Sequence, residues 1–133
     1  MITRETDYSI RLVLAMAIRQ RKGVMSVSSA EVAKDMDIPY RFLRKLVVQL
    51  VNGGLIETRR GKGGGMALAR SPESISLYDV VAITGPRGVE FSPCVSDPKT
   101  CDRSALCRIH REFKVIQNDV DKRLKSVQIA DMV

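Results

Sequence analysis

The sequence predicts a mainly α-helical protein with a small β wing, in which a winged helix-turn-helix precedes a long C-terminal dimerisation helix. Three features support this fold class: capped N-terminal segments with apolar residues at helical spacing, two strand-like runs joined by a glycine-rich turn, and a C-terminal apolar seam. The 133 residues suffice for one domain with an additional helix. We expect the winged helix-turn-helix domain at residues 1–84, a cysteine-containing cluster loop at 85–103, and the dimerisation helix with a C-terminal tail at 104–133.

Two amphipathic helices are expected at the start of the chain. Over residues 6–19, apolar side chains recur at the spacing of one helix face. The second helix begins after Ser28 and extends to about residue 36, because Ser28 and Glu31 form a Ser-x-x-Glu capping box. A turn therefore separates the two helices.

The third helix is expected to have one buried and one basic face. It begins at or beside Pro39, whose missing N–H costs no hydrogen bond there, and it ends at Gly53. The basic face carries Arg41, Arg44 and Lys45. The buried face has the i, i+3, i+4, i+7, i+8 spacing and consists of Leu43, Leu46, Val47, Leu50 and Val51.

A β-hairpin is expected after the third helix. Residues 55–60 and 66–70 are short strand-like runs, and the glycine-rich segment 61–65 joins them. Arg60 and Lys62 lie at this turn, so we expect two cations at a flexible hairpin tip. The order helix, turn, helix, hairpin is that of a winged helix-turn-helix.

The C-terminal part is expected to contain a short helix, a loop and a long helix. Ser76 caps the short helix over residues 77–84, and Gly85 and Pro86 stop it. From about residue 104, apolar residues recur in steps of three and four, the spacing of a helix that packs against a partner helix. This seam consists of Ile109, Phe113, Ile116, Val120, Leu124 and Val127. We therefore expect a homodimer.

The charge balance favours a polyanionic partner. Twenty-two Lys and Arg against fifteen Asp and Glu leave a net charge of +7, which favours nucleic acid over an anionic membrane surface. We expect Arg41, Arg44 and Lys45 to contact double-stranded DNA in the major groove. Arg60 is expected to enter the minor groove, with Lys62 beside it. The alternatives are a solvated basic face and an acidic protein partner.

Several other classes of protein fit the sequence poorly. The N-terminus lacks the pattern of a signal peptide, and no apolar run approaches the roughly 20 residues of a membrane-spanning helix, so we expect a cytoplasmic protein without a membrane partner. An enzyme using Cys107 and His110 is disfavoured, because no Cys-x-x-Cys occurs and no acidic residue is placed to orient the histidine. We therefore expect no catalytic residues and no small-molecule substrate.

All three cysteines and the single histidine lie within residues 94–110. The order is Cys94, six residues, Cys101, five residues, Cys107, two residues, His110. Structural zinc sites usually contain closely spaced Cys-x2–4-Cys pairs, which are absent here. Thiolates five or six residues apart can hold an iron-sulfur cluster. By spacing alone, zinc and metal-free thiol sensing also stay open.

Several stretches together match one family of proteins. The matching residues are Thr6, Asp7 and Tyr8 with Arg11, then Leu43 and Leu46, residues 52–55, the wing sequence 60–65, and the three-cysteine loop. Over nearly its full length the chain resembles the Rrf-type iron-sulfur transcription regulators, the group that contains the IscR, NsrR and RirA proteins. The resemblance implies a homodimeric regulator of a roughly palindromic operator, whose DNA binding responds to cluster state through redox, iron or nitric oxide.

The resemblance also implies a set of cluster ligands. Cys94, Cys101 and Cys107 would be three of them, and His110 lies where IscR-like proteins place the fourth ligand of a [2Fe-2S] cluster. Asp7 matches the residue that NsrR-like proteins supply from the other subunit to a [4Fe-4S] cluster; otherwise it is an ordinary first-turn carboxylate. We favour [2Fe-2S] with His110, because imidazole replaces thiolate in such centres. A regulator without a cluster, sensing through thiols or a partner protein, is the alternative.

Overall fold

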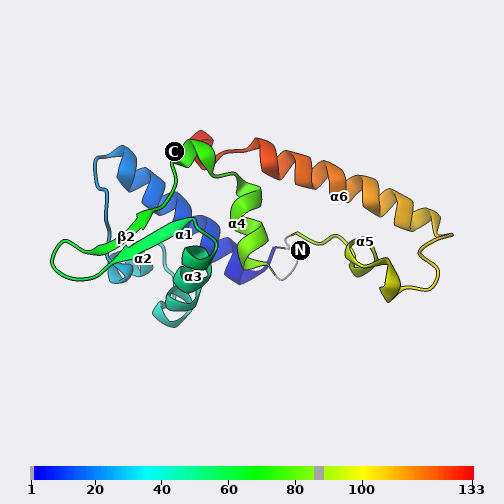
Figure 1. Cartoon of the computed structure of the whole chain (residues 1–133), viewed down its shortest axis with the longest axis horizontal. Helices are drawn as coiled ribbons and strands as arrows, with labels where there is room; N and C mark the ends of the chain where they lie inside the picture. The colour runs from blue at the N-terminus through cyan, green and yellow to red at the C-terminus, as the bar shows by residue number, and fades with distance from the viewer. Residues whose placement is uncertain (1, 86–88) are drawn as a thin grey trace.

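The predicted fold class is confirmed. The computed structural model describes residues 2–85 and 89–133, which form a mainly helical structure with one two-stranded antiparallel sheet. Helices α1 to α4 and the hairpin gather in one body, and α6 extends away from it with α5 alongside (Figure 1). The expected helix stop at Pro86 lies outside the described residues.

The first two helices begin at side-chain caps. Helix α1 (Arg4–Arg21) is capped by Thr3, whose hydroxyl accepts a hydrogen bond from the Thr6 N–H at 3.2 Å. Helix α2 (Ser29–Asp35) has the predicted capping box, in which Ser28 and Glu31 each accept a hydrogen bond from the other's backbone N–H. These caps satisfy N–H groups that have no partner within the helix.

Helix α3 (Tyr40–Asn52) follows Pro39 and packs with one face on the core. Leu43, Leu46 and Leu50 are fully buried, as predicted. The prediction for Val51 was wrong, because Val51 is 36% exposed. Each residue of an α-helix is rotated by about 100° from the one before it, so Val51 lies beside the buried face of which Leu50 is part.

The predicted hairpin consists of β1 (Ile56–Arg59) and β2 (Gly65–Leu68), which pair in antiparallel register. A third segment extends this sheet, since the Val27 N–H donates to the Met66 carbonyl at 3.0 Å and the Met66 N–H donates back at 2.8 Å. A Cβ atom at Gly65 would lie 2.7 Å from the Val27 carbonyl oxygen. Glycine is therefore required where the wing approaches this segment.

Helix α4 (Leu77–Thr84) joins the hairpin to the remainder of the chain. Ser76 and Asp79 form its capping box, and the 3-10 turn η1 (Pro72–Ser74) precedes it. The helix packs against α1 and α3. A Cβ atom at Gly53 would overlap the Ile83 side chain, so a larger residue would require Ile83 to shift where α3 ends against α4.

The chain end returns to the N-terminal body after α6 (Arg108–Ser126). The 3-10 turn η3 (Ile129–Met132) follows α6, and Ile129 is fully buried in the core. The Ile129 N–H donates to the Ile75 carbonyl at 2.8 Å. The end of the segment 104–133, which was expected to form the dimerisation helix and tail, thus packs into the first domain. The domain limits at 84 and 103 stay predictions.

The cysteine segment contains more regular structure than the loop that the sequence predicts. Helix α5 (Pro93–Ser96) and the 3-10 turn η2 (Pro98–Thr100) each begin with proline, whose fixed φ angle favours a first helical position. Helix α6 begins at Arg108, later than expected, because Cys107 is its N-cap. No helix in the described part of the chain is long and apolar enough to cross a membrane.

Candidate nucleic-acid interface and cysteine segment

The three cations predicted on α3 share its exposed face. Arg41, Arg44 and Lys45 are all exposed, on the side away from the buried leucines. Lys45 is held by an ion pair, with its Nζ 2.6 Å from Oε1 of Glu5 on α1. The Arg41 guanidinium lies 5.0 Å from the centre of the Phe42 ring, a cation–π contact. Their role in DNA binding stays a prediction.

The Arg44 side chain has neither an ion pair nor a hydrogen bond within residues 2–85 and 89–133. Two uncharged side chains share its surface, since Tyr40 is 54% and Val48 59% exposed. Neither residue was predicted from the sequence as part of the interface. Helical spacing could have identified Val48, because this residue lies one helical turn after Arg44.

The hairpin carries the other two predicted cations. Arg60 and Lys62 are exposed at its tip, which projects from the helical body (Figure 1). Arg59 pairs instead with Glu57, with 3.2 Å between guanidinium and carboxylate. Helix α3 packs against β1, so the basic face of α3 and the hairpin belong to one packed unit.

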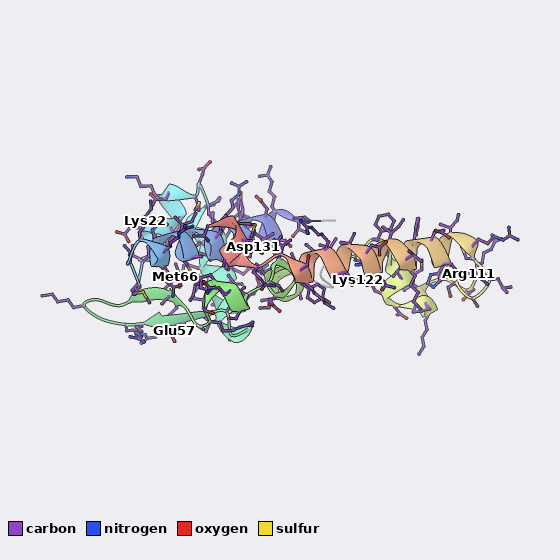
Figure 2. The ribbon with its side chains drawn as sticks, turned by 90° about the horizontal axis from the view of Figure 1, so that it is seen from above. Lys22, Glu57, Met66, Arg111, Lys122 and Asp131 are labelled. Carbon is purple, nitrogen blue, oxygen red and sulfur yellow. The ribbon has the colours of Figure 1, made fainter. Side chains whose placement is uncertain are left out.

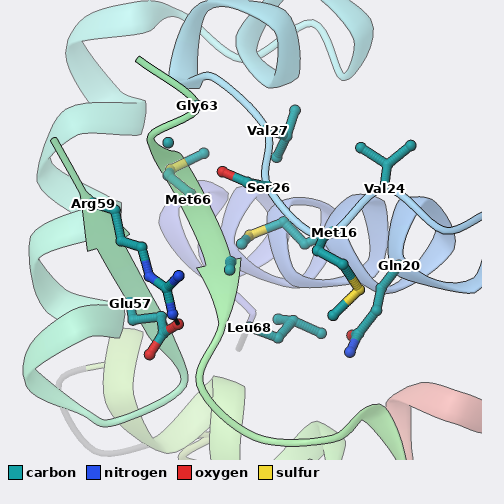
Figure 3. A pocket seen from close by; sticks show the side chains of 13 residues that line it. Met16, Gln20, Val24, Ser26, Val27, Glu57, Arg59, Gly63, Met66 and Leu68 are labelled. Atoms are coloured by element: carbon teal, nitrogen blue, oxygen red, sulfur yellow. Dashed lines mark hydrogen bonds and ion pairs between the residues drawn. The ribbon is translucent and has the colours of Figure 1, made fainter. Parts of the chain in front are cut away.

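A small cavity lies at the base of the hairpin. It has a volume of about 230 Å³ and is bounded by α1, the segment before α2 and both strands (Figure 3). Met16, Gln20 and Met66 line it. Gln20 Oε1 is buried and has no hydrogen-bond partner among the described residues. None of the predicted site residues lines this cavity.

The three cysteines are free thiols in or beside three different helical elements. Cys94 lies in α5, Cys101 follows η2, and Cys107 caps α6. Cys94 Sγ lies 3.4 Å from the Ser92 hydroxyl, and Cys107 Sγ accepts a hydrogen bond from the His110 N–H at 3.4 Å. Of all Cys, His, Asp and Glu in the described ranges, no three are grouped so that they could hold a metal ion. The structure therefore does not bring the predicted ligands together.

The donor set nevertheless fits an iron-sulfur cluster chemically. All three thiols are half-buried and form no disulfide, and three thiolates with one imidazole form a set that such clusters accept. The His110 Nδ1 is buried without a hydrogen-bond partner in the described part of the chain. A buried polar atom without a partner is costly, so this nitrogen is suited to a ligand. Binding at all four positions requires residues 94–107 to rearrange.

Asp7, the alternative fourth ligand, is engaged within α1. Its carboxylate lies 2.8 Å from the Arg11 guanidinium, one helical turn later. The Arg11 side chain also contacts the Tyr8 ring, at 5.9 Å from the ring centre. The structure does not bring Asp7 together with the cysteines.

Gln117 holds the cysteine segment against α6. Its side-chain oxygen accepts a hydrogen bond from the Phe91 N–H at 2.8 Å, and its side-chain nitrogen donates to the Val89 carbonyl at 2.6 Å. Phe91 also stacks edge-on against Phe113, with 5.0 Å between ring centres. The Gln117 side-chain nitrogen also donates to Asp121 Oδ1, one helical turn later, at 2.9 Å. The sequence did not indicate the role of Gln117, because the two backbone groups that it binds are more than twenty positions away and leave no local signal.

The predicted apolar seam of α6 is incompletely covered. No residue of α6 is buried, and Ile109 and Ile116 are 61% and 39% exposed. Figure 2 shows the helix extending from the body, with Arg111 at its far end and Lys122 nearer. Exposed apolar residues on such a seam are typical of a surface that binds another protein.

Comparisons with known proteins identify similar transcriptional regulators. The model of a family described as Rrf2, iron-dependent transcriptional regulator, matches residues 2–133. The chain is 37% identical over 109 residues to the HTH-type transcriptional regulator NsrR of Halalkalibacterium halodurans, covering 81% of this chain and 73% of that protein. A crystal structure of a putative transcriptional regulator from Listeria innocua is 26% identical with a TM-score of 0.76, covering 99% and 85% of the two chains. The structure of T. potens IscR shares the fold, with 22% identity, a TM-score of 0.73 and the same coverage.

Proposed function

Because the chain belongs to the Rrf2 family of transcriptional regulators, and is therefore a DNA-binding regulator and not an enzyme, we propose that an iron-sulfur cluster controls its binding to DNA. The observation that carries the proposal is the separation of two features within one chain. A cationic helix with an adjacent hairpin offers a DNA-binding surface. Three free thiols and a buried, unpartnered histidine nitrogen occupy a distant segment attached to α6.

The proposed DNA-binding surface consists of α3, the recognition helix, and the hairpin tip. Arg41, Arg44 and Lys45 enter the major groove, which accommodates an α-helix. Arg60 and Lys62 contact the adjacent minor groove and phosphates. A palindromic operator matches two such surfaces related by two-fold symmetry, with recognition helices about 34 Å apart.

The proposed dimer forms through α6. The exposed seam residues Ile109 and Ile116 supply apolar area that a second copy of the helix can bury. Replacing Ile116 with Asp is expected to give a monomer in light scattering, because a carboxylate in this seam has no partner to offset its desolvation. The matched change of Val115 to Asp, outside the seam, is expected to leave the dimer intact.

Cys94, Cys101 and Cys107 would hold the cluster, with His110 as the fourth ligand of a [2Fe-2S] centre. Asp7 from the other subunit is the alternative ligand, for a [4Fe-4S] centre. When bound, such a cluster supplies an inorganic core that oxidants, nitric oxide or iron shortage can remove. Because the described conformation separates the thiols, their ligation selects a different arrangement of α5 and η2.

The connection to DNA binding follows from how the segment is attached. Gln117 fastens residues 89 and 91 to α6, and the tail at Ile129 fastens the other end of α6 to the N-terminal body. A rearranged cysteine segment therefore changes the contacts at one end of a helix whose other end lies in the DNA-binding domain. The cluster controls DNA binding only if the cluster-bound and cluster-free forms of the protein have different affinities for DNA.

A cluster-free regulator that senses through its thiols is the second candidate. The observation in its favour is that Cys94, Cys101 and Cys107 are free and separated. Purification without oxygen, followed by visible absorption, Mössbauer spectra and iron and sulfide analysis, tests the two candidates. The proposal predicts a coloured protein with iron and inorganic sulfide. A colourless, iron-free protein even after reconstitution would establish the cluster-free alternative.

A further inference from the structure

Val48 is an exposed apolar residue within the cationic surface of α3. Its side chain is 59% exposed, more than that of any other valine of the described chain. It lies four positions after Arg44 and three after Lys45, so all three project from neighbouring positions of one helix face. The Val48 side chain contributes little to the hydrophobic core, because the buried leucines lie on the opposite side of α3.

A single exposed apolar residue is common on protein surfaces and needs no function by itself. Val48 differs in its surroundings. Ile109 and Ile116 are also exposed, but they belong to the α6 seam through which the dimer is proposed to form, and Val115 lies on α6 far from any cationic helix face assigned to DNA. Val48 lies on a surface whose charged residues suit DNA, and DNA presents one apolar group in its major groove.

We propose that Val48 determines sequence specificity by contacting the C5-methyl group of a thymine. The inference rests on the proposed DNA-binding function of α3. Thymine alone among the four bases carries a methyl group at the major-groove edge, and an aliphatic side chain contacts it favourably. Cytosine at the same position lacks this methyl group, so it offers the valine a smaller apolar contact.

The geometry also limits which base pair is contacted. Val48 lies roughly 4.5 to 6 Å further along the helix axis than Lys45 and Arg44, at about 1.5 Å per residue. Base pairs are about 3.4 Å apart, so the thymine lies within one or two base pairs of those contacted by the two cations. Val48 would therefore select for a thymine methyl group, in addition to the polar contacts that Arg44 and Lys45 make with DNA.

Removal of single methyl groups from the DNA tests this proposal. A preferred duplex is first selected by the full-length protein from a random pool, and each thymine is then replaced with deoxyuridine, which lacks only the methyl group. For the wild type, one thymine per half-site is expected to show a loss of affinity of about 4-fold, the effect of one buried methyl group. For Val48→Ala this loss is expected to disappear. Replacing that thymine with 5-methylcytosine is expected to be milder than replacing it with cytosine.

The control is Val115→Ala, the same substitution at a valine of α6 that is 53% exposed. It is expected to retain the wild-type sensitivity to uracil, and circular dichroism checks the folding of both variants. Equal uracil sensitivity in Val48→Ala and the wild type overturns the Val48 proposal, as does a preferred duplex insensitive to uracil at every position. Both results leave the proposed regulator intact. Failure to select any preferred duplex overturns both proposals.

Discussion

Lys45 of the recognition helix is ion-paired with Glu5 of α1, with 2.6 Å between Nζ and Oε1. The two residues are forty positions apart in the sequence. A cation that is to contact DNA is thus already neutralised by a carboxylate of its own chain. When DNA binds, either this ion pair breaks or the Glu5 carboxylate stays close to the negatively charged phosphates.

Replacing Glu5 with Gln is therefore expected to tighten DNA binding. The pair is partly exposed, and such pairs contribute about 0 to 1 kcal/mol, so the dissociation constant is expected to fall by up to about 5-fold. Fluorescence anisotropy with a labelled duplex measures the change, which should shrink as salt is raised. Glu73→Gln, the same change on an exposed residue of η1, is the control. Weaker binding, or an equal gain from both variants, contradicts this role of Glu5.

Replacing Gln117 with Ala is expected to release the cysteine segment from α6. Two hydrogen bonds to Val89 and Phe91 are lost, and each typically contributes about 1 kcal/mol, or roughly 5-fold in a local opening equilibrium. Alkylation of the cluster-free protein, followed by mass spectrometry, is expected to show faster modification of Cys94 and an unchanged rate at Cys107. Gln117→Glu keeps the acceptor for Phe91, but it places a carboxylate beside Asp121 and the Val89 carbonyl, so it is also expected to release the segment. Unaltered Cys94 reactivity would show that Gln117 does not hold the segment.

Substitution of the two candidate fourth ligands distinguishes the cluster types. His110→Ala is expected to lower the iron and sulfide content after anaerobic reconstitution and to alter the visible spectrum, because it removes the nitrogen donor. Asp7→Ala is expected to retain the cluster, since that carboxylate is paired with Arg11. The opposite pattern would support a [4Fe-4S] cluster that both subunits bind.

Truncation of Ile129 is expected to destabilise the whole N-terminal body. Ile129 is fully buried, and removing such a side chain to Ala typically costs about 2 to 5 kcal/mol. The free energy of unfolding in urea measures the loss. Met132→Ala, three residues later and 38% exposed, is expected to change it by less than about 0.5 kcal/mol. Similar effects of the two substitutions would show that the tail does not belong to the core.

Much of the fold was predictable because its signals are local. The capping boxes at Ser28 and Ser76 lie within four residues of chain and mark where α2 and α4 begin. The packing of Ile129 in the core was not predictable from the sequence. Its hydrogen-bond partner Ile75 lies far away in the chain, and no local pattern of residues indicates this contact. The exposure of Val51 shows that a regular apolar spacing does not fix the width of the buried face.

Some features of the candidate site were likewise predictable from local spacing, and others depend on tertiary packing. Helical spacing placed Arg41, Arg44 and Lys45 on one exposed face, since the period of an α-helix determines which residues are neighbours. The pairing of Lys45 with Glu5 depends on how α1 packs on α3, which the sequence pattern does not specify. The relative placement of the cysteines likewise depends on tertiary contacts, including those of Gln117.

We propose that the cluster changes how tightly the protein binds DNA. The most direct test is to measure, on one selected duplex at one salt concentration, the dissociation constants of the anaerobically prepared protein before and after removal of its iron. If the cluster controls binding, the two constants are expected to differ by at least about 10-fold, equivalent to about 1.4 kcal/mol, on this duplex. Equal dissociation constants for the iron-loaded and iron-free forms would contradict it.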